Sequence, residues 1–140
     1  MKRVFFVLVL SLTSLACKKD DPDPAIESIV GKWRLDAYEK MVSGEQIWEK
    51  VPAGQSSYLT FRFDGVMLDS KDLPMCCAQG GYYLNGAFFG IKPKSSLPHN
   101  PQCGLIDCIG CSTLNFEQAG DELIITYCPP ISTRAKYVKI

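Results

Sequence analysis

The segment GKWRLDA, residues 31–37, alternates between apolar and polar side chains. Successive side chains of a β-strand point to opposite faces, so this period of two predicts a strand with one buried face. Its apolar members Trp33, Leu35 and Ala37 would share the buried side, and residues 58–63 repeat the pattern. The alternation therefore indicates a sheet with one face on a core and the other in solvent.

Dipeptides that favour tight turns separate the alternating segments. Asp64-Gly65 and Asn85-Gly86 suit the type I′ hairpin, which needs positive φ at two successive residues. Ser43-Gly44 and Ala119-Gly120 are weaker versions of the same signal. Residues 25–30 are long enough for one short helical turn before the first strand. The chain is thus expected to run as a series of hairpins.

Sequential hairpins form a meander, and closing the meander into a barrel removes exposed strand edges. The sequence predicts an all-β fold: a small antiparallel up-and-down β-barrel of eight or nine strands, with a β-sandwich as the alternative. The expected strands cover about residues 31–42, 45–51, 57–63, 66–70, 81–85, 87–92, 112–118, 122–128 and 134–140.

The first 16 residues have the composition of a secretory signal peptide. Lys2 and Arg3 precede an apolar run over residues 4–16, and small residues stand near its end. The run is too short to cross a membrane as a helix, which takes about 20 residues. We therefore expect residues 1–16 to be removed on export.

The residue that follows the signal is a cysteine. Ser14-Leu15-Ala16-Cys17 resembles the lipobox of bacterial lipoproteins, which implies cleavage before Cys17 and a diacylglyceryl thioether on its sulfur. The alternative is an ordinary signal cleaved near Ala16, with Cys17 left as a thiol or half of a disulfide. Seven cysteines without Cys17 leave an even set of six, which favours lipidation.

Residues 17–25 would then form a lipidated flexible tether, because charges and two prolines keep such a segment extended. Lys18-Lys19-Asp20-Asp21 resembles the charged export tag of surface lipoproteins of the Bacteroidetes kind. The resemblance implies a lipid anchor in the outer membrane and display at the cell surface, with the periplasmic face as the alternative. Residues 26–140 would form the folded domain.

A short helical turn followed by Gly31-Lys32-Trp33 resembles the G-x-W opening of lipocalins. Trp48, the LTFRFDG segment at 59–65, the LIITY hairpin and the final KYVKI are also similar to small bacterial lipocalin-like lipoproteins. This resemblance implies a lipocalin-like barrel that binds a small apolar or amphipathic ligand. Residues that would contact the ligand are Trp33, Phe61, Phe63, Tyr82, Phe88 and Phe89.

Two of these expectations have alternatives. Trp33 would also serve as a plug of the barrel floor, without touching a ligand. The whole protein would alternatively be a surface or envelope protein-interaction module, with a packed barrel and disulfide-bound contact loops at 71–79 and 93–111. A barrel interior filled by side chains would favour that second function.

Six cysteines follow the tether: Cys76, Cys77, Cys103, Cys108, Cys111 and Cys128. Cys108-x-x-Cys111 with His99 nearby is compatible with zinc binding or redox chemistry. Export to an oxidising compartment favours structural disulfides instead. Cys76 and Cys77 would pair with Cys103 and Cys108, in an order that the sequence leaves open.

A hairpin turning at Ala119-Gly120 would place Phe116 opposite Leu123 and Leu114 opposite Ile125. In the same register Cys111 lies across from Cys128, at a non-hydrogen-bonded pair where Cα atoms approach to about 4.5 Å. That distance lies within the disulfide range, so a Cys111–Cys128 bond is predicted.

The charge balance and the absence of known motifs argue against nucleic-acid binding and catalysis. Without Lys2 and Arg3 the mature chain has 13 basic and 15 acidic side chains, so no basic excess would attract nucleic acid. The single histidine, His99, stands between prolines, and no catalytic or phosphate-binding motif is present. We expect no enzyme, metal or cofactor, and we expect a membrane, a hydrophobic ligand or an envelope protein as partners.

Overall fold

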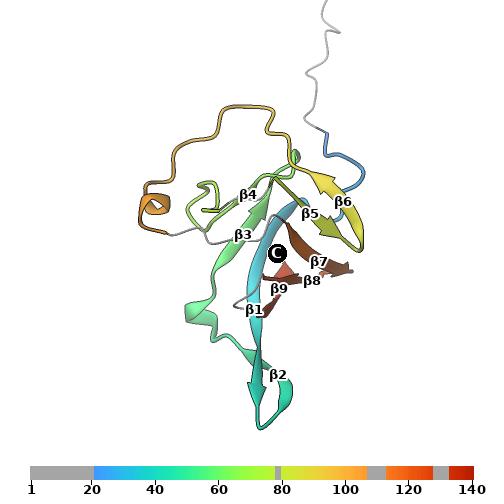
Figure 1. The fold of residues 1–140 in the computed structure, drawn as a ribbon, viewed down its shortest axis with the longest axis vertical. Helices are drawn as coiled ribbons and strands as arrows, with labels where there is room; N and C mark the ends of the chain where they lie inside the picture. Colours follow the sequence, from blue (N-terminus) through green and yellow to red (C-terminus); the bar gives the residue numbers. More distant parts are fainter. Residues whose placement is uncertain (1–20, 78–79, 107–112, 128–132) are drawn as a thin grey trace, which may run out of the picture.

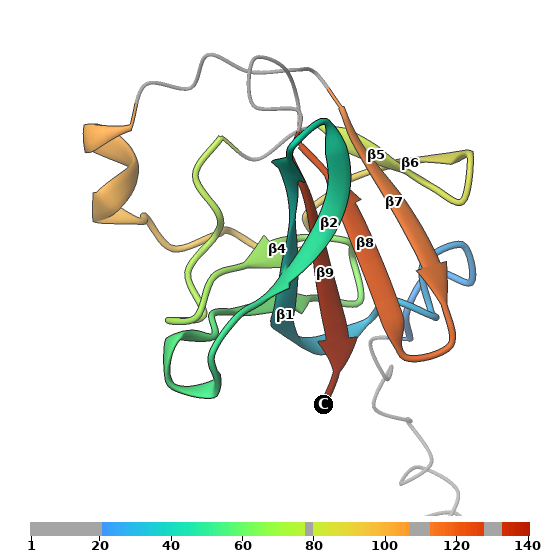
Figure 2. The ribbon, with the colours of Figure 1, turned by 90° about the horizontal axis from the view of Figure 1, so that it is seen from below.

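The computed structural model describes residues 21–77, 80–106, 113–127 and 133–140, and its regular structure is almost entirely β. Within these ranges, nine strands join one mixed sheet, which curls into a half-barrel (Figures 1 and 2). The all-β class predicted from alternation is therefore confirmed, and each expected strand is present. The strands are β1 (Gly31–Val42), β2 (Glu45–Lys50), β3 (Tyr58–Phe61), β4 (Met67–Leu68), β5 (Gly81–Leu84), β6 (Ala87–Gly90), β7 (Leu114–Ala119), β8 (Glu122–Thr126) and β9 (Arg134–Lys139).

Two short 3-10 helices, Ala53–Gln55 and Pro101–Leu105, interrupt the connections between strands. Before β1, residues 24–29 form hydrogen-bonded turns, and the Val30 amide donates to the Ile26 carbonyl at 3.2 Å. That bond has helical i to i+4 spacing, so the chain makes the short helical turn expected before the first strand.

The order of strands across the sheet is β4-β3-β1-β9-β8-β7-β5-β6, with β2 added to β1. All pairs are antiparallel except β5 and β7, which run parallel. The prediction of a purely antiparallel up-and-down barrel is wrong at this point. The tight β5–β6 hairpin places β6 outside β5, so the long connection after β6 returns β7 to the other side of β5 in the same direction. β4 and β6 are not paired with each other, which leaves the barrel half closed.

The concave side of the half-barrel is filled by buried side chains. Trp33 is fully buried, and its indole Nε1 donates a hydrogen bond of 2.7 Å to the Ile29 carbonyl. Phe61, Tyr82 and Phe116 pack together, with ring centroids 4.6 to 6.1 Å apart. The other members of this core are Ile26, Ile29, Leu35, Leu59, Met67, Leu84, Leu114, Leu123, Ile125, Ala135 and Tyr137. These contacts make Trp33 part of the packed floor.

A β-bulge interrupts the pairing of β1 with β9. Leu35 pairs with Tyr137, but Ala37 pairs with Lys136, so β1 has one extra residue at this point. Beyond Tyr38, the β1 residues pair with β2 alone. The β1–β2 hairpin consequently projects beyond the rest of the sheet, at the lower end of the molecule in Figure 1.

The turns agree with the sequence at two of four sites. Ser43-Gly44 and Asn85-Gly86 both have positive φ at two successive residues, as a type I′ turn requires. Asp64-Gly65 does not: only Gly65 has positive φ, and residues 63–65 form a three-residue loop closed by the bond from the Arg62 amide to the Val66 carbonyl. A glycine in the left-handed conformation at the end of such a loop is a common alternative to the type I′ turn.

The β7–β8 hairpin also turns one residue later than predicted. Its central residues are Gly120 and Asp121, and Ala119 pairs with Glu122. Phe116 therefore lies opposite Ile125, not Leu123, although the shift of two keeps the same side chains inward. The observed register places Ile124 opposite Glu117 and so avoids the repulsive Glu117–Glu122 pair of the predicted one.

Replacing Gly65 by Ala tests how tightly the 63–65 loop packs. A Cβ at this position would overlap the Phe89 ring and lie 3.1 Å from the Tyr82 hydroxyl, in a backbone conformation with φ of +83°. Gly86 has a φ of +85° and no neighbour within 4 Å of its Cβ position, so Gly86→Ala is the matched control. We expect Gly65→Ala to lower the free energy of unfolding by about 1–3 kcal/mol more than Gly86→Ala, measured by urea denaturation. Equal losses would show that the loop does not pack as described.

Candidate functional site

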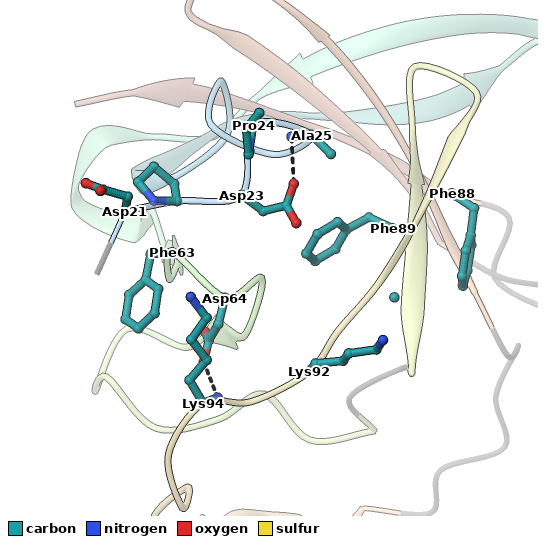
Figure 3. A pocket seen from close by; sticks show the side chains of 12 residues that line it. Asp21, Asp23, Pro24, Ala25, Phe63, Asp64, Phe88, Phe89, Lys92 and Lys94 are labelled. Atoms are coloured by element: carbon teal, nitrogen blue, oxygen red, sulfur yellow. Dashed lines mark hydrogen bonds between the residues drawn. The ribbon is translucent and has the colours of Figure 1, made fainter. Parts of the chain in front are cut away.

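A groove of about 770 Å³ opens on the surface between three separate segments of the chain (Figure 3). The first is the extended segment just before the helical turn, the second is the β3–β4 loop, and the third is β6 with the residues that follow it. The groove is lined by Asp21, Pro22, Asp23, Pro24, Ala25, Phe63, Asp64, Phe88, Phe89, Gly90, Lys92 and Lys94. The lining combines apolar rings with charges of both signs.

Aromatic rings form much of its surface. The Phe89 ring points into the groove in Figure 3 and packs on Tyr82 with centroids 5.5 Å apart. Phe88, its neighbour on the edge strand β6, is 58% exposed and borders the groove, but its ring lies on the other side of the strand from Phe89, where it contacts Tyr83 edge-on at 5.4 Å (Figure 3). Phe63 is half-buried on the opposite side. An exposed phenylalanine beside further rings is an apolar surface available to a ligand.

Charged groups of opposite sign lie on different sides of the groove. Lys92 and Lys94 are exposed and follow β6, and the Lys94 ammonium lies 5.1 Å from the Phe63 ring centroid. Asp21 and Asp23 come from the segment on the other side, where the Asp23 carboxylate accepts a 2.9 Å bond from the Ala25 amide. Among the described residues neither lysine forms an ion pair. The groove is therefore amphipathic and nearly neutral.

Asp64 holds two of the three segments together. Its carboxylate is 4% exposed and accepts bonds from Arg62 Nη2 at 2.8 Å and from the Lys94 amide at 3.0 Å. Burial acts to raise the pKa of Asp64, but the amides of Lys94 and Val66 and the Arg62 guanidinium outweigh it. The pKa of Asp64 therefore lies below its ordinary value of 3.8. The carboxylate stays ionised and fixes the backbone of Lys94 beside the β3–β4 loop.

Tyr82 lies beneath the β3–β4 loop. Its hydroxyl packs against Gly65 and is buried, without a hydrogen-bond partner among the described residues. Burial raises the pKa of Tyr82, and the negative charges of Asp64 and Asp23 raise it further. The phenol therefore stays protonated and can donate its hydrogen bond to an acceptor.

The segment that follows Lys94 is secured at two further points. Asn100, 5% exposed, donates to the Asp69 carboxylate at 3.1 Å and to the Pro74 carbonyl at 3.0 Å. A disulfide joins Cys76 to Cys103. These bonds hold the described parts of the contact loops predicted at 71–79 and 93–111 to each other.

The structure separates the predicted ligand contacts into two groups. Trp33, Phe61 and Tyr82 belong to the packed core, where Phe61 and Trp33 are almost completely buried. Phe63, Phe88 and Phe89 line the groove. The charged members of the site were not predicted, because two lie in the segment interpreted as a tether, one at the end of an expected strand and one in the loop that follows it. The missed residues are Asp21, Asp23, Lys92 and Lys94.

The Cys76–Cys103 bond is one of the pairings that the sequence left open, and Cys77 is disulfide-bonded as well. The predicted Cys111–Cys128 bond relied on a hairpin register that differs from the observed one by two residues, so its geometric argument no longer holds. Cys17, Cys108, Cys111 and Cys128 lie outside the described residues.

No family model matches the chain, and no curated protein or solved structure matches it either. In the ranges that the structure covers, no three metal-binding side chains cluster in a way that could hold an ion. No helix in those ranges has the length and apolarity needed to span a membrane.

The lowered pKa of Asp64 predicts how stability depends on pH. The folded protein holds this proton less tightly than the unfolded chain does, so the carboxylate stabilises the fold above about pH 4, and this contribution declines as the pH falls through the lowered pKa. We expect Asp64→Asn to cost about 1–3 kcal/mol at pH 7, because Arg62 loses a charged partner. This difference in the free energy of unfolding should shrink at about pH 2–3 in urea titrations, because the wild-type carboxylate becomes protonated there.

Asp72→Asn is the control for this prediction, since Asp72 is an exposed turn residue with a φ of +58°, a conformation that Asn tolerates. A deficit for Asp64→Asn that is the same at every pH would contradict an ionised, hydrogen-bonded Asp64.

Proposed function

We propose that this protein is a lipid-anchored lipoprotein of the cell envelope that binds an amphipathic ligand on its surface. The observation that carries the proposal is the groove, in which Phe63 and Phe89 lie beside two lysines and two aspartates and Phe88 borders the edge at β6. Ligand sites combine apolar walls with a few convergent polar groups, and this surface has both. The aromatic rings would contact the apolar part of the ligand, and the lysines would bind an acidic group.

The ligand is assigned to the outside of the half-barrel. The inner side is filled by the core around Trp33, Phe61 and Phe116, which leaves a lipocalin-like internal ligand no room among the described residues. The lipocalin-like relationship itself is part of this proposal. It is supported by the helical turn before Gly31-x-Trp33 and by the bond from the Trp33 indole to Ile29 at the floor.

The Tyr82 hydroxyl supports a ligand with an acceptor atom. A buried polar group without a hydrogen-bond partner destabilises a protein by about 1–3 kcal/mol. A ligand atom that accepts the hydrogen bond of the Tyr82 hydroxyl would therefore stabilise the complex. Asp64 and Phe89, which line the groove, lie close to this hydroxyl. An acceptor that entered between them would reach it from the groove side.

Anchoring is proposed through Cys17. Lipobox-like residues 14–17 and the charged segment that follows support acylation, and several acyl chains on one residue anchor stably where a single chain does not. The outer membrane, with the domain at the cell surface, is the proposed location. The described domain begins only a few residues after Cys17, so it would stay close to the bilayer.

A second candidate function is an envelope protein-interaction module, and the filled interior favours it. The projecting β1–β2 hairpin exposes apolar side chains, with Met41 62%, Val42 42% and Ile47 44% exposed. The loops held by Cys76–Cys103 add a second rigid surface. Either surface would remain available to a protein while the groove is occupied.

Replacing Cys17 by Ser tests the anchor. The variant cannot carry the thioether, so we expect it in the soluble fraction after cell lysis, whereas the wild type sediments with membranes. Persistence of the variant in the membrane pellet after an alkaline wash would count against the anchor.

Titration with dodecylphosphocholine, followed by calorimetry, tests the groove. We expect Phe88→Ala and Lys94→Gln each to weaken binding by about tenfold, which corresponds to ~1.4 kcal/mol. Tyr82→Phe should also weaken binding, yet leave the unliganded protein at least as stable as the wild type, because it removes a buried hydroxyl that has no hydrogen-bond partner among the described residues.

The matched controls are Met41→Ala and Lys40→Gln on the projecting hairpin, which remove an exposed apolar group and a lysine far from the groove. If these controls weaken binding as much as the groove variants, the groove is not the site.

A further inference from the structure

We infer that the groove faces the bilayer that holds the anchor and binds its zwitterionic phospholipid headgroups. This inference rests on the proposed function, because it requires acylation of Cys17. It goes further by naming the occupant of the groove in the anchored protein and by fixing the orientation of the domain on the membrane.

The first argument is the length of the tether. Asp21 stands four positions after Cys17, and four extended residues span at most about 14 Å. Residues 21–25 themselves form one wall of the groove. An acyl chain on Cys17 would therefore hold this wall within a short distance of the membrane surface. Two other cavities of the described domain are lined by residues much further along the chain, at 35–57 and 85–124.

The second argument is the apolar surface beside that wall. Phe63 and Phe89 are partly buried in the groove, and Phe88, 58% exposed, stands at its rim on the outer side of the edge strand β6. Aromatic side chains favour the boundary between headgroups and acyl chains, where one part of the ring is apolar and the other meets polar groups. Insertion of Phe88 would bury a ring that is exposed in the described structure.

The third argument is charge complementarity. Asp64 is neutralised by Arg62, which leaves Lys92 and Lys94 on one side of the groove and Asp21 and Asp23 on the other. A zwitterionic headgroup offers a phosphate to the lysines and an ammonium to the aspartates. An anionic headgroup would satisfy the lysines but meet repulsion from the aspartates. The balance of two cations and two anions therefore fits the zwitterion better.

The orientation that follows is consistent with the shape of the molecule. The blue segment that begins the described chain lies near β6, toward one end of the long axis, and the β1–β2 hairpin projects at the other end (Figure 1). With the groove on the bilayer, the hairpin with its exposed Met41 and Ile47 points away from the membrane.

The inference is tested with the acylated full-length protein, reconstituted into phosphatidylcholine vesicles whose acyl chains carry bromine, a quencher of tryptophan fluorescence. Phe88→Trp reports from the groove, and Ile47→Trp on the hairpin is the matched control. Both are made in a Trp48→Phe background, so that the buried Trp33 is the remaining native tryptophan in each. Mass spectrometry of the purified protein records the acyl chains on Cys17.

We expect the emission of Phe88→Trp to be quenched in brominated vesicles and that of Ile47→Trp to be unchanged. Adding Lys92→Gln or Lys94→Gln should lower the ratio of docked to undocked domains by about five-fold each, which corresponds to ~1 kcal/mol for a lost contact with the headgroup phosphate. The charge-matched control Lys40→Gln should leave the quenching of Phe88→Trp unchanged.

Equal quenching at positions 88 and 47 in an acylated, vesicle-bound protein would overturn the inference and leave the anchor intact. Quenching at position 88 that requires phosphatidylglycerol would overturn the choice of a zwitterionic headgroup. A purified protein without acyl chains on Cys17 would overturn the proposed anchor, and the inference with it.

Discussion

The packing of Trp33 on the inner side of β1 is the contact on which the rest of the structure depends. β1 pairs with β2, β3 and β9, so it joins both halves of the sheet. The Trp33 indole ties this strand to Ile29 and so determines where the preceding segment leaves the core. Because residues 21–25 form one wall of the groove, the floor of the half-barrel also positions a part of its outer surface.

The other wall depends on one buried carboxylate. Removing a charged pair from water is costly, so Asp64 and Arg62 contribute less to stability than their short distance suggests. Their main effect is geometric: the carboxylate binds the backbone amide of Lys94 and brings the segment after β6 against the β3–β4 loop. Asn100 and the Cys76–Cys103 bond then hold the continuation of that segment. A groove with fixed walls loses little conformational entropy when a ligand binds.

Alternation of side chains was sufficient to predict β1 and β3, where burial follows a period of two. β2 and β6 have no buried residue, and they were predicted because turn residues precede or follow them. Turns were predictable where two residues with positive φ follow each other, as at Asn85-Gly86. They were not predictable at Asp64-Gly65, where a buried carboxylate and the packing of Gly65 on Phe89 favour a longer loop. The register of β7 and β8 depended on avoiding a contact between two glutamates, which a dipeptide rule does not consider.

The parallel pairing of β5 and β7 depends on the path of a long connection, about which local patterns carry no information. The site was predictable only in part for the same reason. Phe63 and Phe88 were predicted as ligand contacts because large aromatic rings are common at ligand sites, wherever they lie in the sheet. The lysines and aspartates were missed because their meeting depends on tertiary structure, and each is unremarkable in its own segment.

The pairing of β1 with β9 has a consequence for how the chain reaches its native state. Trp33 lies opposite Lys139, so the central strand acquires this neighbour only when almost all of the intervening sequence is present. Proteins dominated by such distant pairings fold slowly, because the entropy of closing a long loop is lost before the contacts form. If the protein is exported as proposed, this delay is useful. The sheet would stay incomplete during export, and the cysteines would meet oxidising conditions before the fold closes around them.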